Sequence, residues 1–305
     1  MISHLNNLAV AATLPTASMQ TDPIDRESLM ERFDQEILCL VPQEHFFPKE
    51  AIRASFLPKK YDAQDLQKIW EDFWFLKEQT FANAEKSTEY IATAGGPSAG
   101  KSTILEEHLS SNPNKFAYID PDRSCLQKMP NSYLADLENN RRDVAGAYDH
   151  WREASNLLAN VFLAYAIDQG YAIAHGTTMT SPHIATMLSF LKNHDYTRVL
   201  QHVNCPDDVR LSTEEIRRQG GIFQCTDEDL INKGVDFHKR LGDYLANSDK
   251  VIFYYRPSIE TTIVAATKDS DGLKVENPGA FEKIANLYNE AIEGGNFEKQ
   301  VTLAR

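Results

Sequence analysis

Hydrophobic positions recur with two different periods along the chain. Between about residues 23 and 86 they fall every three or four positions, which is typical of helices that bury one face. The clearest such stripe consists of Leu66, Ile69, Trp70, Phe73 and Leu76. From about residue 87 onward, short apolar runs alternate with longer helical stretches. This alternation predicts an α/β fold in which helices cover both faces of a mainly parallel sheet.

These patterns divide the chain into three parts. Residues 1–22 are small and polar, and we expect a flexible tail there. Residues 23–86 predict an N-terminal helical region whose apolar stripe docks on the rest of the chain. Residues 87–305 predict the α/β domain. Within it, the segment QGGIFQCT at 219–226 interrupts the helical pattern and is expected to form a mobile lid.

The elements of the α/β domain can be placed approximately. Strands are expected at 90–94, 116–119, 171–174, 198–203 and 251–255. Helices are expected from 101 after the first strand, at 151–169, from Ser181, from Pro206, at 227–246 and at 279–292. A hairpin is expected at 262–277, turning at 269–272.

The stretch GGPSAGKST directly follows the first expected strand. Its spacing of glycine, lysine and serine matches the phosphate-binding loop, and it has the flanking strand and helix that this motif requires. Glycines let consecutive backbone N–H groups converge on phosphate oxygens, and the following helix adds its positive dipole end. The lysine is expected to reach the β- and γ-phosphates, and the serine hydroxyl to bind Mg²⁺. The predicted nucleotide-binding residues are Gly95, Gly96, Pro97, Ser98, Ala99, Gly100, Lys101, Ser102 and Thr103.

Composition narrows the class of protein further. The net charge is −13, from 44 acidic and 31 basic residues, which argues against nucleic acid or an anionic membrane as the main partner. The longest apolar-rich segment, 157–167, is too short to span a bilayer. Four cysteines without CxxC spacing argue against a zinc site or a disulfide framework. We expect a cytoplasmic protein, with secretion into a host cell as the alternative.

A protein with a phosphate-binding loop could be a GTPase, a motor ATPase or a kinase. The Asn-Lys-x-Asp guanine reader of GTPases is not matched, because the nearest string, NKGVD at 232–236, is one residue too long and lies in an expected helix. The strand after the loop helix ends at Asp120. In small-molecule kinases a carboxylate at this position faces both the metal and the acceptor hydroxyl. Its position therefore favours phosphoryl transfer to a substrate.

The chain resembles the zeta-toxin family of phosphate-loop kinases across roughly residues 88–290. The matching segments are GGPSAGKST, YIDPDR at 118–123, HWREASNLLANVFLAYAIDQGYAIAHGTT at 150–178, ATML at 185–188, NCP at 204–206 and the region of Arg217. The resemblance implies a P-loop kinase-like three-layer fold, ATP and Mg²⁺ as cofactors, and a hydroxyl of a small molecule as phosphate acceptor. Zeta toxins act on UDP-N-acetylglucosamine, and a related effector branch acts on NAD.

The resemblance also assigns the catalytic groups. Asp122 aligns with the family's catalytic base, and Asp120 supports it through metal or water, with Ser102 as the second metal ligand. A carboxylate beside the γ-phosphate can accept the proton of the attacking hydroxyl. The alternative is that Asp120-Pro121-Asp122 is a turn with a helix cap. Lys101 completes the phosphate-binding set.

An arginine ahead of the lid is the third catalytic candidate. Arg217 aligns with an ATP-clamping arginine of the family, and such a cation stabilises charge on the transferred phosphoryl group. It could instead be a surface charge of its helix, close to Glu214. Arg218 takes the role if the alignment is shifted by one residue.

Candidate acceptor-binding residues lie after the third strand and on the helix before it. Thr177 matches the family's threonine and can hydrogen-bond the acceptor, while His175 can contact the acceptor or be structural. His150 and Glu153 are three residues apart on one helix face, which suits the acceptor pocket better than a metal site, because no third ligand is apparent.

Three positions depart from the family's substrate side. His175 stands where an acidic residue is frequent, Met179 where an arginine grips the substrate, and Ala159 where a carboxylate holds the amino sugar. These departures argue against UDP-N-acetylglucosamine. The acceptor is expected to be a nucleotide sugar or an NAD-like dinucleotide.

The leading hypothesis is an ATP-dependent small-molecule kinase that acts as a toxin or effector. A nucleotide-binding regulatory module without transfer activity is the alternative. Zeta toxins are commonly held inactive by a helical antitoxin, so the N-terminal helical region is expected either to bind an antitoxin or chaperone, to inhibit the enzyme in cis, or to support the fold.

Overall fold

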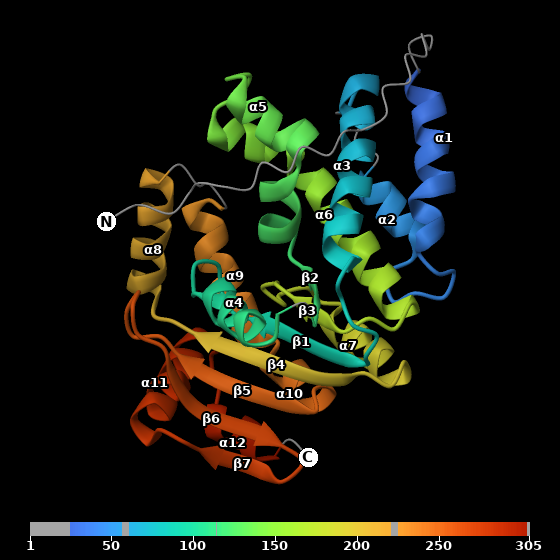
Figure 1. Cartoon of the computed structure of the whole chain (residues 1–305). Coiled ribbons are helices and arrows are strands. Elements are labelled where there is room, and N and C mark those ends of the chain that lie inside the picture. The colour runs from blue at the N-terminus through green and yellow to red at the C-terminus, as the bar shows by residue number, and fades with distance from the viewer. Residues whose placement is uncertain (1–24, 57–60, 114, 221–224, 304–305) are drawn as a thin grey trace.

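A seven-stranded sheet forms the centre of the molecule (Figure 1). The structure, a computed structural model, describes residues 25–56, 61–113, 115–220 and 225–303. The strands are β1 (Glu89–Ala94), β2 (Ala117–Ile119), β3 (Ile173–His175), β4 (Thr197–Asn204), β5 (Lys250–Tyr255), β6 (Ile263–Asp269) and β7 (Gly272–Val275). Their order is β2-β3-β1-β4-β5-β6-β7. The first five strands in this order are parallel and the last two are antiparallel, so the predicted mainly parallel sheet is confirmed.

Helices lie on both sides of this sheet (Figure 1). The N-terminal helices are α1 (Arg26–Glu36), α2 (Lys49–Phe56) and α3 (Ala63–Phe81). The others are α4 (Lys101–Ser111), α5 (Ala135–Glu138), α6 (Val144–Asp168), α7 (Ile184–Asn193), α8 (Asp207–Gln219), α9 (Asp227–Lys239), α10 (Leu241–Asn247), α11 (Pro278–Ala291) and α12 (Phe297–Leu303). Short helical turns are η1 (Leu38–Leu40), η2 (Pro121–Cys125), η3 (Leu126–Lys128) and η4 (Pro130–Leu134).

The N-terminal helices share one hydrophobic core with the sheet. They lie with α6 on the β2 side of the sheet, whereas α11 and α12 lie on the β7 side (Figure 1). Phe73 of the predicted stripe is fully buried, and its ring centroid lies 5.3 Å from that of Phe162 in α6. The Tyr61 hydroxyl donates a hydrogen bond of 2.7 Å to the carbonyl of His150. The apolar stripe therefore packs against α6.

Several element boundaries differ from the sequence-based expectation. The helix expected at 227–246 is two helices, α9 and α10, separated at Arg240. Helix α6 begins at Val144 because the Asp143 carboxylate caps it by accepting from the Gly146 amide at 2.7 Å. Helix α7 begins at Ile184 and not at Ser181, whose hydroxyl accepts from the amide of His183 within a turn. The last helix, α12, was not expected from the sequence.

Some expectations concern residues that are not described. The tail at 1–22 lies outside the described residues, and so do residues 221–224 of the expected lid. Helix α8 ends at Gln219, and the chain is described again from Cys225, just before α9. Within the described ranges, no helix is both long and apolar enough to cross a membrane.

Candidate active site

The loop between β1 and α4 has the backbone shape of a phosphate-binding loop. Gly100 precedes α4 with φ of 86°, in the left-handed region that favours glycine. A Cβ atom there would also overlap the guanidinium of Arg256. A side chain at Gly96 would meet Arg210, with only 2.6 Å between the added Cβ and Nη1. Arg210 and Arg256, which are distant from the loop in sequence, therefore pack against its glycines.

The predicted nucleotide-binding residues face different environments. Five of them line the largest cavity, namely Pro97, Ser98, Gly100, Lys101 and Ser102. Gly96 and Ala99 instead border a smaller cavity of about 420 Å³. The Gly95 amide already donates to the carbonyl of Thr178 at 3.2 Å, so Gly95 shapes the turn and has no free N–H for phosphate. Thr103 is exposed.

Lys101 is held in place for an anionic ligand. Its Nζ donates to the carbonyl of Gly96 at 2.7 Å. Burial, together with the positive charges of Arg217 and Arg210, lowers the pKa of Lys101 to about 7. The carboxylates of Asp120 and Asp122 act in the opposite direction. A phosphate group would restore the charged form of this amine.

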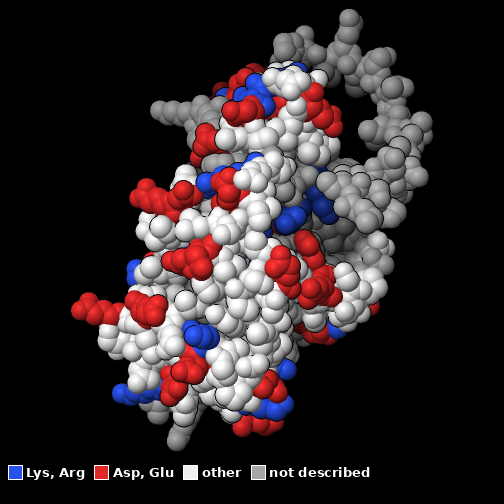
Figure 2. Space-filling view, turned by 90° about the vertical axis from the view of Figure 1, so that its left-hand side faces the viewer, with Lys and Arg blue, Asp and Glu red and all other residues white. Residues whose placement is uncertain are grey.

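The largest cavity has a volume of about 870 Å³ and joins the loop to the carboxyl ends of the strands. It is lined from α4, η2, α6, the segment after β3, α8 and α9. Its cationic lining residues are Lys101, Arg123, Arg152, Arg217 and Lys233, and its anionic ones are Asp120, Asp122, Asp149 and Asp229. On the face shown in Figure 2, acidic side chains are widely spread, whereas several basic side chains gather in a hollow. In a protein with a net charge of −13, this lining is close to balanced, and its cations can interact with a phosphate ligand.

Asp120 and Asp122 flank the proline at the end of β2. The carboxylate of Asp120 accepts from the backbone amides of Asp122 at 2.8 Å and of Arg123 at 2.9 Å, which caps the turn η2. Asp120 is buried, and burial raises its pKa. Its second oxygen lies 3.3 Å from the Tyr118 hydroxyl. The alternative of a capped turn therefore describes Asp120, and the cap fixes the backbone that carries Asp122.

The side chain of Asp122 lines the cavity. It is 24 % exposed and forms an ion pair with Arg152 of α6, with 2.9 Å between Oδ1 and Nη1. Because its backbone is fixed by the cap of Asp120, the carboxylate has a defined position at the cavity wall.

Arg217 rather than Arg218 lines the cavity. Its Nη1 donates to the Ser98 hydroxyl at 3.1 Å, and that hydroxyl donates to the buried carboxylate of Glu214 at 2.5 Å. Arg218 binds the carboxylate of Asp227 at 2.8 Å. Helix α8 is thereby coupled to the phosphate-binding loop through the pair Glu214 and Arg217.

The residues after β3 have distinct roles. Thr177 lines the cavity, and its hydroxyl accepts from the Met179 amide at 3.1 Å. The Met179 side chain is buried, so it does not replace a substrate-gripping arginine. His175 lies outside the cavity lining, with Nδ1 2.8 Å from the Tyr90 hydroxyl. Burial lowers the pKa of His175 to about 4, so the ring is neutral at pH 7.

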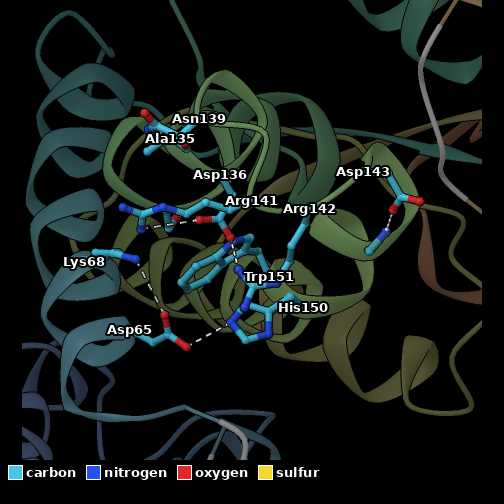
Figure 3. A network of polar contacts seen from close by, with 12 residues as sticks. Asp65, Lys68, Ala135, Asp136, Asn139, Arg141, Arg142, Asp143, His150 and Trp151 are labelled. Atoms are coloured by element: carbon cyan, nitrogen blue, oxygen red, sulfur yellow. Dashed lines mark hydrogen bonds and ion pairs between the residues drawn. The ribbon is translucent and has the colours of Figure 1, made fainter.

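His150 and Glu153 are not brought to the cavity. His150 faces α3, with Nε2 2.9 Å from the carboxylate of Asp65. Figure 3 shows this contact beside the buried Asp136, which accepts from the indole of Trp151 at 2.8 Å. Glu153 is exposed. This face of α6 holds the N-terminal helices, while the next face, with Asp149, Arg152 and Asn156, lines the cavity.

Four site residues were missed by sequence reasoning. Arg152 forms the ion pair with Asp122, and Glu214 accepts a hydrogen bond from Ser98. Arg210 and Arg256 pack against the phosphate-binding loop. Arg152 lies within HWREASN, three residues after Asp149. Residues at this spacing share one face of a helix, so a cavity-facing Asp149 would have indicated that Arg152 also faces the cavity. The positions of Arg210 and Arg256 carry no local signal, because only the parallel sheet brings β4 and β5 beside the loop.

The cavity offers oxygen ligands suited to Mg²⁺. The Ser102 hydroxyl and the Asp120 carboxylate both line it, and Mg²⁺ prefers one or two such oxygens together with water and phosphate. These two residues would hold the ion, which supplies neutralisation of phosphate charge when bound. Among the described residues, there is no cluster of three His, Cys, Asp or Glu suited to another metal.

Comparisons with known proteins bear on the family and the fold of the chain. The sequence model of the zeta toxin family matches residues 74–219. No curated protein matches the chain. The crystal structure of the AvrRxo1-ORF1:AvrRxo1-ORF2 complex with ATP is similar, with a TM-score of 0.60 at 15% identity over 80% of this chain and 78% of that chain. The native complex of the same proteins gives 0.61 at 13% identity over 83% and 86%.

A third similar structure comes from the PezAT chromosomal toxin-antitoxin system of Streptococcus pneumoniae. Its TM-score is 0.51 at 14% identity, over 74% of this chain and 97% of that chain. At these identities the similarity concerns the fold, and it confirms the predicted P-loop kinase-like α/β architecture.

Proposed function

Because residues 74–219 carry a zeta-toxin-like domain on a P-loop kinase fold, we propose that the chain is an ATP-dependent kinase that phosphorylates a hydroxyl of a small molecule. One observation carries the proposal. The carboxylate of Asp122 lines the same cavity as Lys101 and Ser102 of the phosphate-binding loop. A base and a triphosphate cradle on one cavity wall are the groups that phosphoryl transfer requires.

The residues of the site have complementary tasks in this reaction. The hydroxyl oxygen of the acceptor attacks the γ-phosphorus while Asp122 accepts the hydroxyl proton. The bond between the γ-phosphorus and the oxygen that bridges it to the β-phosphate breaks. ADP leaves with that bridging oxygen. Lys101 and Arg217 bind the phosphates and balance the charge on the transferred group. Ser102 and Asp120 would hold Mg²⁺.

The acceptor is proposed to be a nucleotide sugar or an NAD-like dinucleotide. The cavity of about 870 Å³ lies within the size range of small-molecule sites, which supports a small-molecule acceptor. Thr177 and Thr178 offer hydroxyls on the acceptor side. His175 is neutral and lies within hydrogen-bond distance of the Tyr90 hydroxyl. It therefore does not take over the role of the acidic residue that is frequent at this position in the family.

We further propose a role as toxin or effector. The solved AvrRxo1 structures are complexes with a second protein, and PezAT is a toxin-antitoxin system, which supports an antitoxin or chaperone as partner. The N-terminal helical region, proposed as residues 23–86, would offer the binding surface for this partner. A cytoplasmic protein or one delivered to a host cell fits this role.

The test is transfer of labelled γ-phosphate from ATP into a metabolite extract, analysed by mass spectrometry. Lys101→Ala and Asp122→Asn are the paired controls, since the first removes phosphate binding and the second removes the base while keeping its shape. A labelled metabolite that both variants fail to form supports the kinase and identifies its acceptor. ATP binding without any transfer would favour the alternative, a regulatory nucleotide-binding module.

A further inference from the structure

Arg152 and Asp122 form an ion pair at the cavity wall. The distance between Nη1 and Oδ1 is 2.9 Å, and the side chains are 27% and 24% exposed. Both line the cavity, although they come from different elements, Arg152 from α6 and Asp122 from η2. The pair is therefore open to a ligand on one side and supported by protein on the other.

Helix α6 gives Arg152 a rigid base. The neighbouring Trp151 is fully buried, and its indole donates to the carboxylate of Asp136 at 2.8 Å (Figure 3). The Arg152 guanidinium lies 5.7 Å from the ring centroid of Tyr148, one turn earlier. The Arg152 Nη1 also donates to the Ser155 hydroxyl at 3.5 Å, and that hydroxyl donates to the Arg152 carbonyl at 2.9 Å. These contacts restrict the positions that the guanidinium can occupy.

Other groups surround Asp122, and none of them duplicates this contact. Electrostatic neighbours are Asp120 and Cys125 of its own segment, Lys101 of α4, Tyr148 of α6 and Tyr133 of η4. Lys101 is already bound to the carbonyl of Gly96 and has the phosphates as its proposed ligand.

We propose that Arg152 is a positioning residue for the phosphoryl transfer, which holds the carboxylate of Asp122 in its orientation at the cavity wall. This inference rests on the proposed kinase function. A general base acts only when its oxygen is within hydrogen-bond reach of the hydroxyl, and the ion pair of 2.9 Å fixes where that oxygen lies. Arg152 acts through Asp122 and need not touch the acceptor.

The experiment compares Arg152→Gln, Arg152→Lys and the matched control Arg141→Gln. Arg141 is a 53 % exposed arginine 4.0 Å from Asp136 and does not line the cavity. Labelled transfer from ATP is measured against a dilution series of metabolite extract, which separates the maximal rate from the half-saturating dilution.

We expect Arg152→Gln to lower the maximal rate about 10- to 100-fold, with the half-saturating dilution unchanged. Arg152→Lys recovers part of the rate, and Arg141→Gln matches the wild type.

The contrary results are distinct. A maximal rate within about twofold of the wild type, or a raised half-saturating dilution with an unchanged maximal rate, would overturn the positioning role. If Arg152→Gln is too unstable to assay, a full rate in Arg152→Lys would count equally against the positioning role, because lysine cannot reproduce the geometry of the guanidinium. Wild-type protein that binds ATP and transfers nothing would overturn the kinase function and, with it, this inference.

Discussion

Proton uptake on ATP binding is a direct consequence of the environment of Lys101. The pKa of Lys101 is lowered to about 7, chiefly by burial and then by Arg217, whereas an ordinary lysine titrates at 10.5. At pH 7.5 only about a quarter of the free protein carries this proton. Triphosphate oxygens beside Nζ favour the charged form and return its pKa toward the ordinary value. Binding therefore takes up about 0.8 proton at pH 7.5, compared with about 0.1 at pH 6 and 0.9 at pH 8.

Isothermal titration calorimetry measures this number. Binding of ATP with Mg²⁺, without acceptor, is titrated in buffers of different ionisation enthalpy, and the slope of the observed enthalpy gives the protons taken up. Lys101→Arg is the matched control, because a guanidinium stays charged throughout this range. The difference between wild type and Lys101→Arg removes the protonation of ATP itself. An uptake that is equal in the two proteins, or that does not rise between pH 6 and 8, would refute this account of Lys101.

Three further predictions address the loop and the core. Gly100→Ala should abolish ATP binding in calorimetry while the circular dichroism spectrum is retained, because the residue has φ of 86° and its Cβ would overlap Arg256; binding within about tenfold of the wild type would contradict this. Burial raises the pKa of Asp72 to about 6, so the folded state holds this proton more tightly than the unfolded state. The free energy of unfolding should fall by at most about 3 kcal/mol as pH rises from 4 to 7, and urea unfolding of Asp72→Asn should lack this slope. Phe73→Ala should lower the free energy of unfolding by about 3–5 kcal/mol in the same assay, and a loss below about 1 kcal/mol would argue against a core shared with α6.

Local signals in the sequence were sufficient for much of the fold. The loop 95–103 has its strand and helix as neighbours in sequence, so its geometry follows from the consecutive residues 89–111. The hairpin 262–277 is equally local, and β6 and β7 pair with their turn at the predicted place. The extra helix α12 was missed because a seven-residue helix has too few positions to show a period.

The site was less predictable because its contacts are made between distant segments. Asp122 was found from its motif, but its partner Arg152 is thirty residues away on another element. His150 and Asp149 are adjacent in sequence, yet one faces α3 and the other the cavity. A rotation of about 100° per residue decides which of them meets a ligand, and this orientation is set by packing of α6 against the N-terminal helices.

The joint core of α3 and α6 also has a consequence for the order of events during translation. Helix α3 ends at residue 81, and α6 is complete only at residue 168, which is 87 residues later. At about 5–20 residues per second, the ribosome needs roughly 4–17 s for this stretch. During that interval the apolar stripe of the nascent N-terminal helices has no native surface to cover it. A nascent chain of this length is therefore the form of the protein in which chaperone binding or aggregation competes most directly with folding.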